Sequence, residues 1–227
     1  MIPRPVNPLI VAVDTSDLEA AVSLGRTLQG HVGLMKVGLE LFAAHGPESV
    51  TRLRAFAPVF LDLKLHDIPA TVEGAARSGA RLGAAMLTVH ALGGEAMVAA
   101  AVRGAREGAD AADAPEPSIL AVTVLSSLGG EGLASPASLA YEATAAGATG
   151  VVVSGEDVTV VREVLGEYAC VVVPGIRPAG TNGHDQVRIL TPEEAVERGA
   201  DYLVVGRPVT GAPDPAGAAR AIVSSVR

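Results

Sequence analysis

The fold of this chain is decided by residues 61–71, which read Leu-Asp-Leu-Lys-Leu-His-Asp-Ile-Pro-Ala-Thr. A β-strand points alternate side chains to opposite faces, so Asp62 and Lys64 share one face while the leucines occupy the other. The apolar start of the segment and the alanine-rich stretch after it are typical of a strand in a parallel α/β sheet, normally buried on both faces. Charged groups are costly to bury there. An ion pair closing a strand end explains Asp62 with Lys64 but not the second carboxylate, Asp67, so we interpret the segment as functional.

Short β-rich runs of this kind recur along the chain and alternate with alanine-rich stretches. They occupy residues 8–13, 32–37, 58–64, 84–90, 118–124, 150–153, 169–173 and 201–205. The stretches between them have helical composition and spacing. Residues 17–28 are one such helix, with Ser16 as the expected N-cap, and residues 192–198 are another, which follows Thr191. Residues 109–117, rich in Ala, Asp and Pro, we interpret as a solvated loop.

Eight strands alternating with eight helices predict an α/β fold, the TIM (β/α)8 barrel. We expect one domain over residues 1–227, because barrels of this length are commonly undivided. A doubly wound open sheet is the competing fold, but it usually has fewer strands and a glycine-rich turn after the first one. This chain has Asp-Thr-Ser-Asp there, at residues 14–17.

Composition and charge exclude several classes of protein. The formal net charge of -8 argues against general nucleic-acid binding, which needs a basic surface. Hydrophobic residues make up 49% of the chain, but no apolar run reaches the roughly twenty residues that span a bilayer. Residues 1–8 lack the apolar core of a signal peptide, so we expect a cytoplasmic protein with no membrane partner. Cys170 stands alone, which rules out an intrachain disulfide, and we interpret it as a small buried hydrophobe.

The active site of a TIM barrel lies at the C-terminal ends of its strands, so the residues that close each run are the candidates. They are Asp14, Lys36, Asp62, Lys64, His90, Ser126, Arg177 and Arg207. The two lysines and the carboxylates form the strongest subset, because alternating opposite charges satisfy one another in a dry pocket where a single charge could not. We therefore expect them to form one network.

Two arginines follow the last two strands, where TIM barrels usually bind phosphate. Residues 174–177 read Pro-Gly-Ile-Arg, and Gly206 with Arg207 follows the eighth strand. Glycine lets backbone amides approach an anion, and arginine can clamp it. Residues 177–186 are long, glycine-rich and without periodicity, which is typical of a lid, a surface excursion being the alternative. Gln186 could then reach an anionic group.

These residues resemble the orotidine 5'-phosphate decarboxylase family over nearly the whole chain. The motifs that carry the resemblance are residues 35–38, 62–72, 173–178 and 202–210. The pattern Asp-x-Lys-x-x-Asp is shared with sugar-phosphate enzymes, but Asp-Ile-Pro at residues 67–69 followed by Thr71, with the two terminal motifs, is specific. Ser126 stands where many bacterial members have threonine.

The resemblance implies decarboxylation of orotidine 5'-monophosphate to uridine 5'-monophosphate, in pyrimidine synthesis and without a cofactor. Lys64 would stabilise and then protonate the carbanion left at C6, whose charge no neighbouring carbonyl can delocalise. Asp62 would hold Lys64 in place. The other implied catalytic residues are Lys36 and Asp67. The implied substrate contacts are Asp14 and Lys36 at the ribose, Ser126 at the pyrimidine, and Pro174, Arg177, Gln186, Gly206 and Arg207 at or near the phosphate.

The resemblance also implies a homodimer, in which Asp67 and Thr71 reach the partner's active site across a two-fold interface, and it implies that Ile68 contacts the substrate. A role at a helix N-terminus is the alternative for Asp67.

We expect no metal site, because the five histidines show no spacing that pairs them with carboxylates or with the cysteine. Two other functions stay open. One is a metal-dependent sugar-phosphate decarboxylase or aldolase, which would stabilise an enediolate. The other is a non-catalytic barrel that binds a phosphate ligand. Neither explains Lys36, Lys64 and the Ile-Pro-x-Thr extension together.

Overall fold

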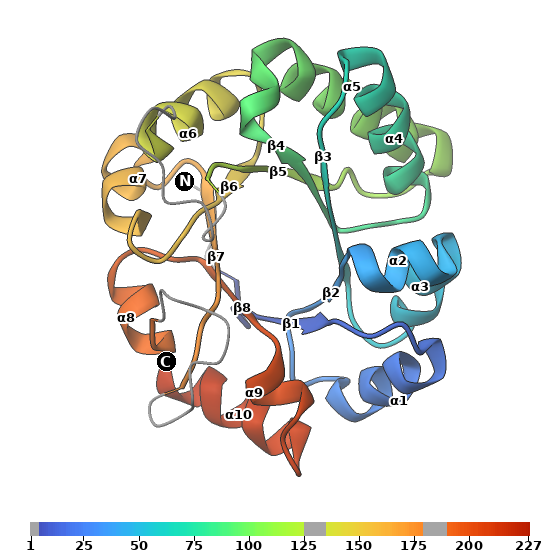
Figure 1. The fold of residues 1–227 in the computed structure, drawn as a ribbon, viewed down its shortest axis with the longest axis vertical. Coiled ribbons are helices and arrows are strands. Elements are labelled where there is room, and N and C mark those ends of the chain that lie inside the picture. Colours follow the sequence, from blue (N-terminus) through green and yellow to red (C-terminus); the bar gives the residue numbers. More distant parts are fainter. Residues whose placement is uncertain (1–4, 125–134, 179–189) are drawn as a thin grey trace.

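Parallel β-strands form the centre of the molecule and close into a barrel. The computed structural model describes residues 5–124, 135–178 and 190–227. Within them, eight strands pair in chain order, and β1 also pairs with β8 (Figure 1). The strands are β1 (Leu9–Val13), β2 (Leu34–Val37), β3 (Val59–Leu65), β4 (Met86–His90), β5 (Ser118–Val122), β6 (Gly150–Val152), β7 (Cys170–Pro174) and β8 (Tyr202–Val205). Each overlaps one of the expected runs, which confirms the predicted TIM barrel.

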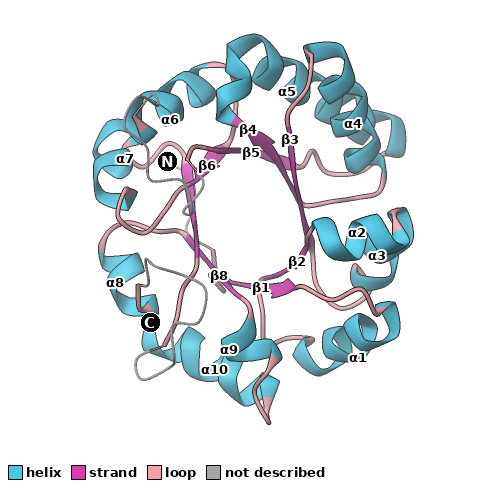
Figure 2. Cartoon of the chain, in the orientation of Figure 1, coloured by secondary structure: helices cyan, strands magenta, loops and turns pink. Residues whose placement is uncertain are grey.

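Helices surround the barrel on all sides (Figure 2). They are α1 (Leu18–Leu28), α2 (Leu39–His45), α3 (Pro47–Leu53), α4 (Pro69–Arg81), the 3-10 turn η1 (Ala91–Gly93), α5 (Gly94–Ala112), α6 (Pro136–Ala145), α7 (Val158–Leu165), α8 (Pro192–Glu197), α9 (Arg207–Thr210) and α10 (Pro215–Ser225). None of the helices in the described ranges combines the length and the apolar character needed to cross a membrane.

Two local predictions about these helices are wrong. The N-cap of α1 is Asp17 rather than Ser16, because the Asp17 carboxylate accepts the backbone N–H groups of Glu19 and Ala20 at 2.9 and 3.0 Å. Helix α5 continues to Ala112, so only the second half of the expected loop over 109–117 is irregular. Alanine is the best helix former, and this outweighs the aspartate among the alanines.

The helix over 192–198 is confirmed, since α8 begins at Pro192 directly after Thr191. The Thr191 hydroxyl accepts the N–H of Glu194, and the Glu194 carboxylate accepts the N–H of Thr191. This capping box satisfies two amides of the first turn.

The apolar core has two layers. Side chains such as Leu61, Leu87 and Val89 pack between the strands and the surrounding helices. Phe60 and Met86, from the alternate positions of the same strands, pack inside the barrel with residues of the other strands. The interior therefore receives the even-numbered residues of β3, and Asp62 and Lys64 are the next two of these. The predicted separation of the charged face from the leucine face is confirmed.

Candidate active site

Four charged side chains, one directly after β1 and the others in β2 and β3, form one chain of alternating sign. The Lys36 ammonium lies 3.1 Å from Oδ1 of Asp14 and 3.6 Å from Oδ2 of Asp62. The Lys64 ammonium donates to both carboxylate oxygens of Asp62, at 2.8 and 2.9 Å. Because each charge touches the opposite one, the desolvation cost of placing them inside a barrel is offset in part. The structure thus brings together four residues that the sequence nominated.

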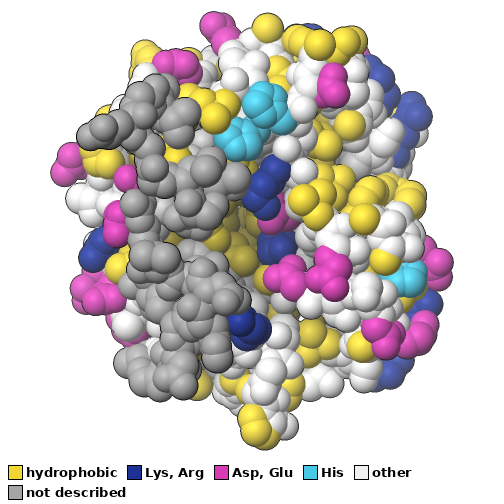
Figure 3. Space-filling model, in the orientation of Figure 1, with side chains coloured by type: hydrophobic (Ala, Val, Ile, Leu, Met, Phe, Trp, Pro, Cys, Tyr) yellow, Lys and Arg dark blue, Asp and Glu magenta, His cyan; other side chains and the backbone are white. Residues whose placement is uncertain are grey.

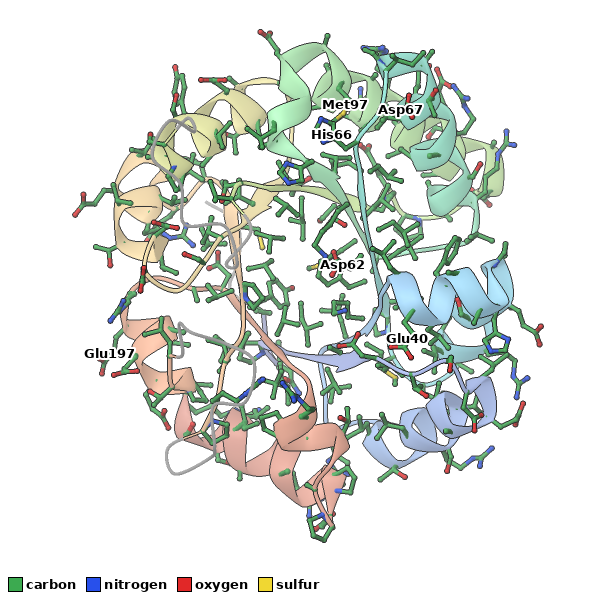
Figure 4. All side chains as sticks on the ribbon, in the orientation of Figure 1. Glu40, Asp62, His66, Asp67, Met97 and Glu197 are labelled. Carbon is green, nitrogen blue, oxygen red and sulfur yellow. The ribbon has the colours of Figure 1, made fainter. Side chains whose placement is uncertain are left out.

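These charges differ in exposure. The side chains of Lys36 and Asp62 are only 11% and 12% exposed, whereas Lys64 is 32% and Asp14 59% exposed. The most buried members lie in the middle of the network. Figure 3 shows basic and acidic side chains beside a central hollow with hydrophobic walls, and Figure 4 shows Asp62 inside the barrel.

A cavity of about 210 Å³ opens beside this network. Its charged wall is formed by Lys36, Asp62 and Lys64. The remaining lining residues are Phe60, Val122, Val124, Val152, Val153, Ser154, Pro174 and Val204. An apolar pocket with one charged wall suits a flat, partly polar ligand, and its low polarity strengthens the field of any ammonium that faces it.

Two arginines lie on the β7 and β8 side of the same end of the barrel. Arg177 is buried, and burial lowers the pKa of its guanidinium, with the positive charge of Arg207 as a second cause. Arg207 is the first residue of α9, directly after Gly206. Two guanidinium groups that repel each other form a site that an anion would stabilise, because a phosphate can accept hydrogen bonds from both. Pro174, at the end of β7, connects this region to the cavity.

Comparison with known proteins agrees with this geometry. A model of the family described as orotidine 5'-phosphate decarboxylase / HUMPS matches residues 7–222. A relative from Anaeromyxobacter sp. strain K, named orotidine 5'-phosphate decarboxylase, is 52% identical and covers 98% of this chain and 100% of its own. A relative of the same name from Moorella thermoacetica is 47% identical, with coverage of 97% and 92%. The chain belongs to the orotidine 5'-phosphate decarboxylase / HUMPS family.

Solved structures of this family have the same fold. The orotidine 5'-phosphate decarboxylase of Lactobacillus acidophilus superposes with a TM-score of 0.83 at 36% identity, over 97% of this chain and 99% of that chain. The protein of that name from Pyrococcus horikoshii OT3 gives a TM-score of 0.77 at 27% identity, over 96% and 99%. The resemblance to the decarboxylase family that the motifs predicted is confirmed, and with it the chain's place in a family of enzymes.

Asp67, Ile68 and Thr71 are not part of the charge network of their own chain. They lie exposed at the start of α4, where the Asp67 carboxylate accepts the N–H of Ile68 at 2.7 Å. Figure 4 shows Asp67 beside α4, apart from Asp62 in the barrel. None of the three lines the cavity as the described residues form it. Their predicted role therefore depends on a second copy of the chain.

Two predicted substrate contacts, Ser126 and Gln186, lie outside the described residues, as does most of the segment over 177–186 that the sequence suggested as a lid. Its N-terminal end is described: the Arg177 N–H donates to the carbonyl of Leu190 at 2.9 Å. That hydrogen bond holds Arg177 next to Leu190, although the two residues lie 13 positions apart in the sequence.

A pair of histidines lies next to Lys64. The rings of His66 and His90 stack with their centroids 5.3 Å apart. Burial lowers the pKa of His90, and the positive charges of His66 and Lys64 lower it further. The lowered pKa favours the uncharged imidazole, whose Nδ1 accepts the N–H of Leu92 at 3.4 Å.

Sequence reasoning missed the apolar wall of the cavity, which is Phe60 with the lining valines, and two hydroxyl residues, Ser154 and Thr88. Phe60 lines the cavity, but nothing in the sequence distinguishes it from an ordinary core residue. The Ser154 hydroxyl lies at the cavity and donates to Asp157 at 2.6 Å. Thr88 is fully buried and bonds to Asp62 at 3.0 Å, and its one signal in the sequence is a hydroxyl inside an otherwise apolar strand. Among the residues described, no group of three or more His, Cys, Asp or Glu side chains could hold a metal ion.

Proposed function

We propose that this protein decarboxylates orotidine 5'-monophosphate to uridine 5'-monophosphate and CO2, in pyrimidine biosynthesis. The observation that carries the proposal is the alternating chain of Asp14, Lys36, Asp62 and Lys64 along one wall of an apolar cavity. Family membership and relatives named orotidine 5'-phosphate decarboxylase support it. We further propose that residues 1–227 act as one barrel domain, since β1 and β8 pair to close the barrel. The proposed cytoplasmic location rests on the sequence of residues 1–8, which has no apolar core of a signal peptide.

The reaction needs a cation at the carbon that loses CO2. When the C6–carboxylate bond breaks, its electron pair stays on C6 in the plane of the ring, and no adjacent carbonyl delocalises it. The Lys64 ammonium would stabilise that charge electrostatically and donate its proton to C6. Lysine then regains a proton from solvent. Asp62 supports this role, because its two oxygens hold the Lys64 ammonium at 2.8 and 2.9 Å.

The rest of the site would bind the nucleotide away from the reacting carbon. We assign the ribose hydroxyls to Lys36 and Asp14, the pyrimidine ring to Ser126, and the region between ring and phosphate to Pro174. The phosphate is assigned to Arg177, Gln186, Gly206 and Arg207. Binding energy gained at the phosphate can stabilise the closed site around the ring. A substrate without its phosphate should therefore lose turnover rate as well as affinity.

We propose that the active unit is a homodimer, in which Asp67, Ile68 and Thr71 complete the partner's site. The exposure of Ile68, 66% of its surface, supports this, because a large apolar side chain at a helix start is more stable when covered. The test mixes Lys64→Ala chains with Asp67→Asn chains. Recovered activity in the mixture supports shared sites, and no recovery despite demonstrated heterodimers overturns them.

The deciding experiment incubates purified protein with orotidine 5'-monophosphate in excess chelator and follows the pyrimidine absorbance. Lys64→Ala serves as the control. Conversion by the wild type alone supports metal-free decarboxylation that depends on Lys64. No conversion by a folded wild-type dimer overturns the substrate assignment and favours the metal-dependent sugar-phosphate enzyme. Nucleotide binding without turnover, unchanged by Lys64→Ala, favours the non-catalytic barrel.

A further inference from the structure

The pairing of β3 with β4 is irregular where the site is built. Leu61 pairs with Leu87 in regular parallel register, but the next pair is Leu65 with Val89. Three residues of β3, from Asp62 to Lys64, therefore lie opposite Thr88 alone. Such a bulge interrupts the ladder of backbone hydrogen bonds and redirects side chains, and it leaves amide groups that need another partner.

The backbone of Lys64 carries the strain of this bulge. Its φ is 51°, in the left-handed region, where the Cβ of an ordinary residue crowds the backbone. Among the described residues other than glycine, only Asp113, at a helix C-terminus, shares a positive φ. A residue holds this conformation only where surrounding contacts compensate for it.

Thr88 supplies those contacts. Its hydroxyl accepts the backbone N–H of Lys64 at 2.8 Å and donates to Oδ1 of Asp62 at 3.0 Å. One buried group thus holds the backbone of the lysine and the side chain of the aspartate at once. The side chain of Thr88 is completely inaccessible to solvent, so water cannot replace it in either hydrogen bond.

We infer that Thr88 is a positioning residue for the reaction, which fixes the Lys64 ammonium and the Asp62 carboxylate relative to each other and to the cavity. This inference rests on the proposed function, because it assumes that Lys64 acts on the substrate. Thr88 itself does not line the cavity. It acts through the bulge: without its hydroxyl, the Lys64 backbone can relax to an ordinary extended conformation, and the ammonium then moves away from its place.

The test replaces the hydroxyl while keeping the shape of the side chain. Thr88→Val has the same branched form and removes both hydrogen bonds, whereas Thr88→Ser keeps the hydroxyl. The matched control is Thr123→Val, since Thr123 is equally buried but donates to the carbonyl of Val152 at 3.3 Å. Circular dichroism and thermal unfolding establish that each variant is folded. If Thr88→Val does not fold, Thr88→Ala takes its place in the comparison with Thr88→Ser.

With orotidine 5'-monophosphate, we expect Thr88→Val to lower kcat by about 10²-fold, the usual effect of misplacing a catalytic group by about 1 Å. KM should stay within about threefold of the wild type, because the ribose and phosphate contacts are untouched. Thr88→Ser and Thr123→Val should stay within about threefold of wild-type kcat. The inference is overturned if Thr88→Val keeps wild-type kcat, if Thr88→Ser loses as much, or if Thr123→Val has the same effect.

A crystal structure of each Thr88 variant separates this inference from the proposed function. We expect Thr88→Val to lose the positive φ of Lys64 or the hydrogen bonds between Lys64 and Asp62, and Thr88→Ser to keep both. If the wild type does not turn over the nucleotide, the proposed function fails, and these structures still decide whether Thr88 positions Lys64. An unchanged Lys64 in Thr88→Val overturns the positioning role by itself.

Discussion

Two networks of partly buried charge lie at opposite ends of the barrel, and they differ in what completes them. The first network lies at the N-terminal ends of β7 and β8, where a guanidinium nitrogen of Arg162 in α7 lies 2.6 Å from a carboxylate oxygen of Asp201. Its remaining hydrogen bonds go to backbone carbonyls, those of Gly166, Ala169 and Gly199, at 2.7–3.0 Å. Asp201 in turn accepts the backbone N–H of Val171 at 2.8 Å. This network is saturated by the chain and ties a helix to the starts of two strands.

The network at the other end is completed only by side chains. Among the described residues, the ammonium groups of Lys36 and Lys64 contact carboxylates, and both lysines line the cavity. An ammonium has three donors, so a ligand in the cavity can still be engaged. Charge that is satisfied by the backbone therefore stabilises the fold, whereas charge that faces a cavity is available for chemistry, as expected for the two ends of a TIM barrel.

Removing the cation at the cavity should have the largest effect on activity. Lys64→Ala should lower kcat by at least about 10⁴-fold, because the variant loses both the proton donor and the charge that stabilises the carbanion. The free energy of unfolding should change by less than about 1 kcal/mol. Lys64 is partly exposed, and its ion pair with Asp62 joins two side chains and holds no backbone group. Steady-state kinetics and urea unfolding measure the two effects.

The control for Lys64→Ala is Arg220→Ala, which removes an exposed cation 3.6 Å from Asp214. It should change neither quantity. The comparison fails if Lys64→Ala keeps kcat within tenfold of the wild type or unfolds far more easily than Arg220→Ala.

The second prediction concerns the saturated network. Arg162→Met keeps the length of the side chain but leaves Asp201 and several buried carbonyls without their partner. Breaking a buried pair in this way costs about 3–5 kcal/mol of unfolding free energy, while kcat of the folded protein should not change. Urea unfolding is the measurement, with Arg103→Met as the matched control, because Arg103 pairs with Glu73 on the surface. Equal losses in the two variants would contradict the structural role of Arg162.

The arginines beyond β7 and β8 test an intermediate case, in which a binding site destabilises the protein that carries it. Arg177→Met should lower kcat/KM by about 30-fold or more, the cost of removing one partner of a buried charge pair. The ligand-free variant should unfold at higher urea concentration than the wild type, because burial and the charge of Arg207 both oppose a guanidinium at this position.

Inorganic phosphate serves as the probe for Arg177. Phosphate should stabilise the wild type against urea more than it stabilises Arg177→Met. Equal stabilisation of the two proteins would mean that Arg177 does not face the anion.

The barrel and its charged C-terminal end could be predicted from the sequence, because both follow from short stretches of neighbouring residues. A parallel strand is a short apolar run, and a polar residue that closes it lies at the mouth of the barrel, which is how Asp14, Lys36, Asp62 and Lys64 were found. Their mutual contacts follow because neighbouring strands bring successive ends together.

Three other features could not be read from the sequence, because each depends on distant parts of the chain. The role of Thr88 arises from a two-residue slip in the pairing of β3 with β4, and threonine is common in ordinary strands. The pairing of Arg162 with Asp201 joins residues 39 positions apart, and an arginine on a helix usually faces solvent. The proposed role of Asp67 would need a second chain, and only the family resemblance suggested it, not the residues by themselves.

The smallest expected effect is a pH dependence of stability at the histidine pair beside Lys64. The pKa of His90 is lowered in the folded state by burial and then by His66 and Lys64, whereas the unfolded chain titrates near the ordinary value of about 6.5. Below that value the unfolded state binds the proton more readily than the folded state does. Stability is therefore expected to fall as the pH drops from about 7 through 6.5 towards the folded-state pKa. Above about pH 7 it should not depend on the titration of His90.

His90→Asn isolates this contribution, because the asparagine oxygen can accept the N–H of Leu92 as Nδ1 does but cannot titrate. Urea unfolding at pH 7.5 and pH 5.5 should show a smaller loss of stability for His90→Asn than for the wild type. Equal losses would assign the pH dependence to other groups. A smaller loss would assign the pH dependence to His90, whose charged form is opposed first by burial and then by His66 and by Lys64 at the cavity.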